Sequence, residues 1–79
     1  MTVTIKLFAT LGKYLPPGST GRAATVEASE GATVGDVLAR FGVPRQAAHL
    51  IMINGMNQSW NAPLKDGDTL TVFPPVAGG

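Results

Sequence analysis

One stretch of the chain, TVGDVLARFG at residues 33–42, has the pattern of an amphipathic α-helix, and it constrains the fold of the rest. Thr33 is placed to act as the N-cap, with Asp36 three residues later in a capping-box arrangement, and Gly42 is placed to end the helix. Gly35 weakens so short a helix by up to about 1 kcal/mol relative to Ala, so packing must hold it. The apolar residues recur at i, i+3, i+4 and i+7 and form one stripe, made of Val34, Val37, Leu38 and Phe41.

The other periodic segments predict strands, because their apolar residues alternate or form short runs bounded by turn residues. These strand segments are residues 2–8, 23–28, 49–53 and 69–73. A short helical turn is expected at 9–14, and Asn54-Gly55 predicts a hairpin turn followed by an irregular or short edge strand through Trp60. This order predicts an α+β domain over residues 1–73, in which one main helix packs on one face of a sheet of four to five strands.

The strand registers place large apolar side chains on the face turned away from the helix. Leu70 and Val72 share the core face of the last strand, so Phe73 lies with the threonines on the other face. By the same alternation, the outward face also receives Phe8, Leu50 and Met52. One exposed apolar residue is normal, but three strands that each contribute one indicate a patch that binds a partner protein, unless the long loop, Tyr14 or Trp60 covers it.

Composition excludes several classes of function. The 79 residues contain no Cys, so disulfides, thiolate metal sites and cysteine nucleophiles are ruled out. A net charge of +1 argues against nucleic-acid binding, and the chain has no apolar run long enough to span a membrane and no signal-peptide pattern. No phosphate-binding loop or metal-ligand cluster is present, and the single His49 is expected to be structural. We therefore expect a cytoplasmic protein that is not a self-contained enzyme, holds no metal and binds no cofactor.

The last six residues, PPVAGG, have a different character from the domain, and we expect residues 74–79 to form an extended C-terminal tail. Pro74 and Pro75 fix φ near −65° and remove two N–H donors, so the chain should leave the sheet stiff and extended. At ~3.3 Å per residue such an arm reaches roughly 20 Å. Gly78 and Gly79 have no Cβ and can pass through a narrow slot, so the tail suits insertion into the active site of another protein.

The Asn-Gly turn, the segment PLKDGDTLTVFPPVAGG and the strand–helix order of TIKLFATL…TVGDVLARF resemble the MoaD/ThiS family of ubiquitin-like sulfur carriers. The resemblance covers essentially the whole chain, and the PLxDGD turn leading to FPPVxGG looks most like the molybdopterin synthase small subunit. It implies the ubiquitin-like β-grasp fold, a mixed sheet whose first and last strands lie side by side in parallel. Phe8 and Phe73 would then be neighbours.

The resemblance also implies a chemistry. A ubiquitin-activating-like adenylyltransferase would use ATP to activate the carboxylate of Gly79, and a sulfur donor protein would convert it to a thiocarboxylate. The large subunit of molybdopterin synthase would then accept the sulfur for a pterin precursor. Gly78 would let the tail pass through a narrow slot in the active site of a partner. The expected partner-binding residues are Phe8, Leu50, Met52, Phe73, Pro74, Pro75 and Val76.

Three other functions stay open at this point. The segment NGMNQSW is less similar to molybdopterin-type members, so the sulfur pathway could be that of the thiamine thiazole or another one. A ubiquitin-like modifier, with Gly79 in isopeptide bonds to lysines, is a function of a different class. A plain binding module with an inert Gly-Gly end is disfavoured most, because it leaves the two prolines, the patch and the glycines unrelated.

Overall fold

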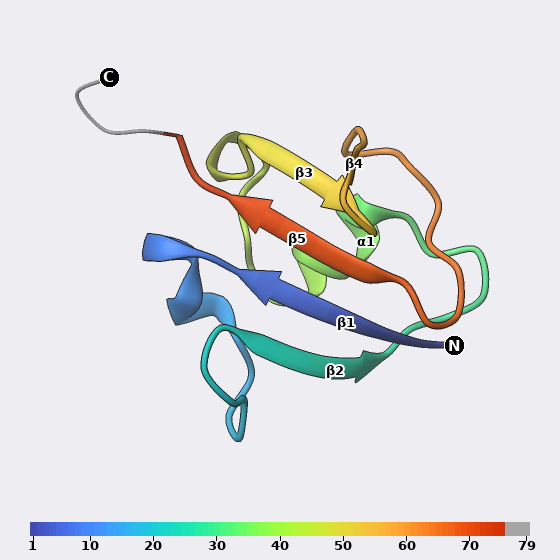
Figure 1. Cartoon of the computed structure of the whole chain (residues 1–79), viewed down its shortest axis with the longest axis horizontal. Coiled ribbons are helices and arrows are strands. Elements are labelled where there is room, and N and C mark those ends of the chain that lie inside the picture. The colour runs from blue at the N-terminus through green and yellow to red at the C-terminus, as the bar shows by residue number, and fades with distance from the viewer. Residues whose placement is uncertain (76–79) are drawn as a thin grey trace.

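Five strands form one mixed sheet in the order β2-β1-β5-β3-β4, as the computed structural model of the chain shows for the residues it describes, 1–75 (Figure 1). The central pair, β1 and β5, is parallel, whereas β2 on β1, β3 on β5 and β4 on β3 are antiparallel. The strands are β1 (Thr2–Leu7), β2 (Ala23–Glu27), β3 (Leu50–Ile53), β4 (Met56–Asn57) and β5 (Thr69–Phe73). This is the predicted β-grasp arrangement, including the parallel first and last strands.

Among residues 1–75, one α-helix, α1 (Val34–Arg40), lies across one face of the sheet, and no helix covers the other face, which is called the open face below (Figure 1). The predicted capping box is present: the Thr33 hydroxyl accepts from the Asp36 N–H at 3.2 Å, and the Asp36 carboxylate accepts from the Thr33 N–H at 3.0 Å. Gly42 follows the helix with a φ of +82°, a conformation that favours glycine. Two 3₁₀ segments, η1 (Ala9–Tyr14) and η2 (Arg45–Ala47), lie in the connections, and η1 was expected from the sequence.

Gly35 has a packing role that its helix propensity does not indicate. A Cβ at this position would lie 2.7 Å from Cδ1 of Trp60, a separation at which something must shift. The Gly35 N–H also donates to the Trp60 carbonyl at 2.8 Å, so the helix and the loop after β4 are joined at this point. The missing side chain therefore allows the indole ring to lie directly on α1.

The core lies between the helix and the sheet, and it is built from the alternating residues that the sequence places on one face of each strand. Val3, Ile5 and Leu7 of β1 and Leu70 and Val72 of β5 are all fully buried. Between them the outward-facing positions are exposed or half-buried. The other buried apolar residues are Leu11, Val26, Val34, Val37, Leu38, Val43, Ile51, Ala62 and Leu64.

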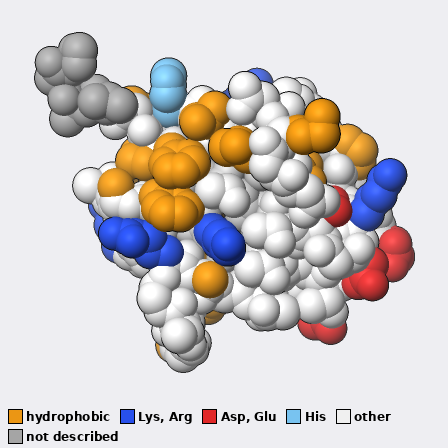
Figure 2. All heavy atoms as spheres, viewed as in Figure 1, with side chains coloured by type: hydrophobic (Ala, Val, Ile, Leu, Met, Phe, Trp, Pro, Cys, Tyr) orange, Lys and Arg blue, Asp and Glu red, His pale blue; other side chains and the backbone are white. Residues whose placement is uncertain are grey.

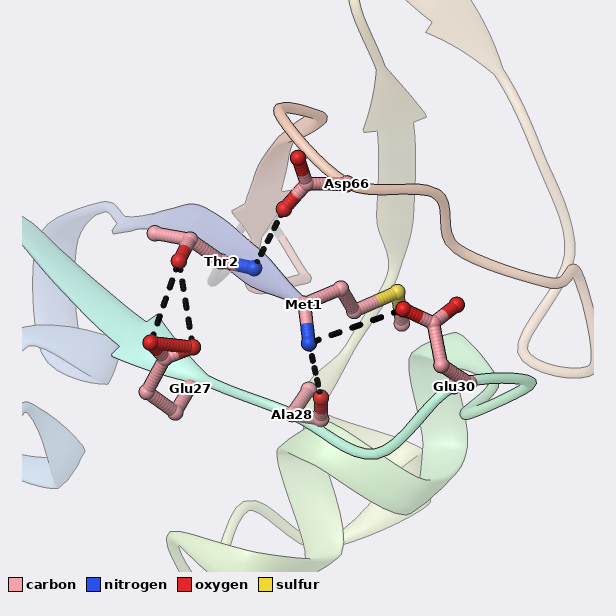
Figure 3. Close-up of polar contacts among 6 residues, drawn as sticks. All are labelled: Met1, Thr2, Glu27, Ala28, Glu30 and Asp66. Atoms are coloured by element: carbon pink, nitrogen blue, oxygen red, sulfur yellow. Dashed lines mark hydrogen bonds and ion pairs between the residues drawn. The ribbon is translucent and has the colours of Figure 1, made fainter.

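Polar contacts gather where β1 begins, at the opposite end of the sheet from the end of β5 (Figure 3). The amino group of Met1 donates to the Ala28 carbonyl at 2.8 Å and lies 3.9 Å from the Glu30 carboxylate. The Thr2 N–H donates to Asp66 Oδ1 at 2.7 Å, and the Thr2 hydroxyl donates to the carboxylate of Glu27. These contacts join β1, β2 and the turn that precedes β5.

The predicted hairpin turn at Asn54-Gly55 joins β3 to β4, with φ values of +52° and +84° that fit a type I′ turn. The Asn54 side chain also joins this turn to the start of β5, since it donates to Asp68 at 2.9 Å and accepts from the Thr69 N–H at 2.9 Å. No helix within residues 1–75 is both long and apolar enough to cross a membrane.

Candidate functional site

Two phenylalanines from distant parts of the sequence stack on the open face of the sheet. The ring centroids of Phe8 and Phe73 are 4.6 Å apart, and the ring planes differ by 17°. The parallel pairing of β1 and β5 causes this contact, because it sets Leu7 beside Val72 and lets the Phe8 N–H donate to the Val72 carbonyl at 3.1 Å. The predicted neighbourhood of the two rings is confirmed.

Strand β3 brings the other two predicted apolar side chains to the same face. Leu50 is the register partner of Phe73, and Met52 is the partner of Thr71. Ile51 is 6% exposed and points into the core, whereas Leu50 is 38% exposed on the opposite face. Phe8, Leu50, Met52 and Phe73 together are called the open-face patch below.

The two aromatic residues that could have covered this patch lie elsewhere. Trp60 packs on Gly35 of α1, and a Tyr14 ring carbon lies 4.0 Å from where a Cβ of Gly42 would be, just after that helix. Both side chains pack against the core cluster. Within residues 1–75, therefore, neither ring lies over the open-face patch.

Cations adjoin the patch, and sequence reasoning did not assign them to it. The guanidinium carbon of Arg22 lies 5.5 Å from the centroid of the Phe8 ring, within the range of a cation–π contact. Lys6 is exposed and lies two residues before Phe8, on the same face of β1. The only signal for Arg22 is its position directly before β2, whose first residue pairs with Lys6 near the end of β1. The long connection between the two strands hides that register in the sequence.

The predicted tail begins directly at the patch. Pro74 is half-buried and Pro75 is exposed, and both follow Phe73 without a break. Val76, Gly78 and Gly79 lie outside the described residues, so the division into a domain at 1–73 and a tail at 74–79 stays a prediction. A protein that binds the open-face patch is held at the base of the segment that leads to Gly79.

Two further predictions from the sequence concern metal ligands and His49. No group of three or more His, Cys, Asp or Glu side chains within residues 1–75 could hold a metal ion. Exposed His49 precedes β3, and its N–H donates to the Phe73 carbonyl at 2.9 Å. That backbone bond extends the pairing of β3 with β5, and the structural role expected for the His49 side chain stays a prediction.

Comparisons with known proteins agree with this geometry. The model of the ThiS family matches residues 5–79. Among solved structures, SAMP1 from Haloferax volcanii is 27% identical with a TM-score of 0.71, and the match covers 100% of both chains. A putative molybdopterin converting factor subunit 1 from Pyrococcus furiosus is 30% identical with a TM-score of 0.70, over 95% of this chain and 98% of that one.

A third structure, a complex of subunits 1 and 2 of the molybdopterin-converting factor from Helicobacter pylori, matches over 100% of both chains. Its identity is 22% and its TM-score is 0.62, so it supports the fold alone. No curated protein matches the sequence. The family model covers nearly the whole chain, and this chain therefore belongs to the ThiS family, within the MoaD/ThiS group of ubiquitin-like sulfur carriers.

Proposed function

We propose that this chain carries sulfur as a thiocarboxylate at Gly79 and delivers it for the synthesis of molybdopterin, as the small subunit of molybdopterin synthase. The observation that carries the proposal is the position of the open-face patch. The stacked rings of Phe8 and Phe73 lie at the end of β5, where Pro74 and Pro75 begin the segment that leads to Gly79. A partner that binds this patch lies next to Pro74 and Pro75, the residues with which the tail begins.

The chemistry requires activation, because a carboxylate resists attack by nucleophiles. The Gly79 carboxylate attacks the α-phosphorus of ATP in a ubiquitin-activating-like adenylyltransferase, and pyrophosphate leaves. The resulting acyl-adenylate is a mixed anhydride, and AMP leaves when sulfide from a sulfur donor attacks the carbonyl carbon. The product is a thiocarboxylate, in which one oxygen has been replaced by sulfur.

In this scheme the chain is a stoichiometric carrier in the cytoplasm, and its partners supply the catalysis. The large subunit of the synthase would then place the thiocarboxylate beside the pterin precursor. Similarity to a molybdopterin converting factor subunit 1 at 30% identity favours this pathway. The match to the ThiS family model keeps a thiazole pathway as the alternative for the same carrier chemistry.

The test of the carrier role is intact mass spectrometry after incubation with ATP, the adenylyltransferase of the same organism and a sulfide source. The protein should gain the mass of one oxygen-to-sulfur exchange, located at Gly79. A variant that lacks Gly79 should melt at the same temperature but gain no sulfur. If that variant still transfers sulfur, the carrier proposal is wrong.

The loaded protein should then convert a pterin precursor only when the large synthase subunit is present. Transfer of the sulfur to a thiazole precursor instead would overturn the pathway and leave the carrier role intact. The precursor assay therefore separates the two pathways.

Similarity to SAMP1, one of whose structures is described as small archaeal modifier protein 1, favours a second function as a protein modifier. The same activated Gly79 would then acylate lysine side chains of target proteins. Tryptic peptides from the native host that carry the C-terminal residues on a lysine would identify this function. If Gly79 occurs only in such linkages, the modifier assignment replaces the carrier assignment.

A further inference from the structure

Strand β2 forms one edge of the sheet in the described part of the chain, residues 1–75 (Figure 1). An edge strand presents N–H and C=O groups that can pair with a strand of another chain. Figure 2 shows the apolar side chains of the open face gathered mainly toward β3 and the end of β5, while few lie over β2. Strand pairing at β2 would therefore not occupy the open-face patch.

The hydrogen bonds to β1 decide which backbone groups of β2 face outward. The Ala28 N–H donates to the Met1 carbonyl at 2.7 Å. Because the bonds of an antiparallel ladder involve every second residue, Val26 also directs its N–H and C=O to β1. The residues of β2 whose N–H and C=O point away from the sheet are Ala23, Thr25 and Glu27.

Two contacts close most of this edge. At one end, the Ala23 N–H donates to the Thr20 carbonyl and the Ala23 carbonyl accepts from the Thr20 N–H, both at 3.1 Å. At the other end, Nη1 of Arg40, the last residue of α1, donates to the Glu27 carbonyl. Within residues 1–75, the outward groups that keep no hydrogen-bond partner are the N–H and C=O of Thr25 and the N–H of Glu27.

The outward groups of Thr25 and Glu27 have the spacing of a twofold pair with β2 of a second copy. Antiparallel pairing centred on Val26 places Thr25 of each copy opposite Glu27 of the other, and these two pairs contain four N–H···O=C bonds. Val26 would face Val26 of the other copy, and no like charges would lie directly opposite one another. Two of the four bonds end on the Glu27 carbonyls, which Arg40 occupies.

We propose that Arg40 keeps the chain monomeric at this edge, because its guanidinium takes the place of the Thr25 N–H of a second copy on the Glu27 carbonyl. Two contacts fix the guanidinium, since its carbon also lies 4.9 Å from the centroid of the Phe41 ring. Loss of the Arg40 side chain frees the Glu27 carbonyl for a β2–β2 pair. This inference does not depend on the proposed function.

The test uses the absence of Cys from the sequence, which allows single cysteines to report the register. Thr25→Cys chains and Glu27→Cys chains are mixed under mild oxidation, with and without Arg40→Ala. The proposed pairing sets these positions about 5.5 Å apart between Cα atoms, within the range of a disulfide. With Arg40→Ala the mixed disulfide should form at least about fivefold faster, because two more hydrogen bonds stabilise the encounter.

Arg45→Ala is the matched control. Arg45 is also exposed and also lies over an aromatic ring, 5.9 Å from the Trp60 centroid, but within residues 1–75 it makes no hydrogen bond to β2. It should leave the rate unchanged, and equal acceleration would overturn the inference, because loss of positive charge alone would then act. Disulfides between two Thr25→Cys chains should be slower than mixed ones, since diagonal neighbours are about 7–8 Å apart; faster ones would overturn the register.

Amide hydrogen exchange tests the inference without cysteines and shows whether the variants fold. In the unaltered protein the Thr25 and Glu27 amides should exchange faster than the Val26 amide, which is bonded to β1. In Arg40→Ala, both should become protected as the protein concentration rises. Arg40→Met, which keeps an unbranched side chain and removes the donor, is measured beside it. No concentration-dependent protection in a folded variant, or loss of Val26 protection in both variants, would overturn the inference.

Discussion

At the scale of single residues, Gly35 shows that helix propensity and packing oppose one another in this chain. Ala at this position should favour the helix by up to about 1 kcal/mol, but its Cβ would lie 2.7 Å from Cδ1 of Trp60. Overpacking of a well-packed site costs about 1–3 kcal/mol. We therefore predict that Gly35→Ala lowers the free energy of unfolding in urea, despite its better propensity.

The double-mutant cycle with Trp60→Ala isolates the cause. Once the indole is removed, Gly35→Ala should become neutral or stabilising, because only the propensity difference is left. The same loss of stability in both backgrounds would contradict the proposed contact and point to a backbone effect.

At the scale of elements, β5 presents two chemically different faces at adjacent positions. Val72 is fully buried against the helix side, whereas Phe73 is half-buried on the open face. We predict that Val72→Asp unfolds the protein, because it buries an unpaired charge. Phe73→Asp should cost about 0.5–1.5 kcal/mol from the lost ring stack, yet leave a folded chain that binds its partner about 2 kcal/mol more weakly.

Circular dichroism melts and a binding titration check this pair. Phe73→Leu serves as the control, because it keeps an apolar side chain without the stacked ring. If Phe73→Asp unfolds the chain as readily as Val72→Asp, the open face contributes to the core and the patch interpretation fails.

The main helix and the four longer strands could be predicted because each follows from local periodicity, whereas η2 (Arg45–Ala47) has no such pattern and was not predicted. Alternation in β1 and β5 and the spacing of Val34, Val37 and Leu38 decide which side of each element is buried. The contacts between Arg22 and Phe8 and between Trp60 and Gly35 could not be predicted in the same way. Each joins residues across a long connection, whose course depends on tertiary packing and not on any local pattern.

The parallel pairing of β1 with β5 could be predicted only in part from the sequence. Both strands are evident locally, but their adjacency followed only from the family resemblance, since their positions in the sequence are far apart. The open-face patch depends on that pairing. The face on which each patch residue lies could therefore be predicted from alternation. That the residues of different strands lie next to one another could be predicted only from the topology.

At the scale of the whole molecule, we propose that residues 74–79 act as a short arm whose stiffness contributes to sulfur transfer. Pro74 and Pro75 restrict the chain where it leaves β5, so less conformational entropy is lost when the tail enters a partner. Replacing both with Gly restores about 1–2 kcal/mol of backbone freedom in total. We predict that Pro74→Gly/Pro75→Gly slows sulfur transfer by about 5- to 30-fold, which corresponds to that free energy.

The chain contains its own control, because Pro16 and Pro17 form a second Pro-Pro pair with the same pattern of half-buried and exposed residues, remote from the tail in sequence. Pro16→Gly/Pro17→Gly should leave the single-turnover rate of transfer unchanged, even if it lowers the melting temperature.

Adenylation of Gly79 should still occur in the tail variant at high enzyme concentration, since the reacting carboxylate is intact. Equal slowing by both double variants would assign the effect to general stability. No slowing by the tail variant would show that the arm is ordered by its partner alone, with the prolines making no contribution.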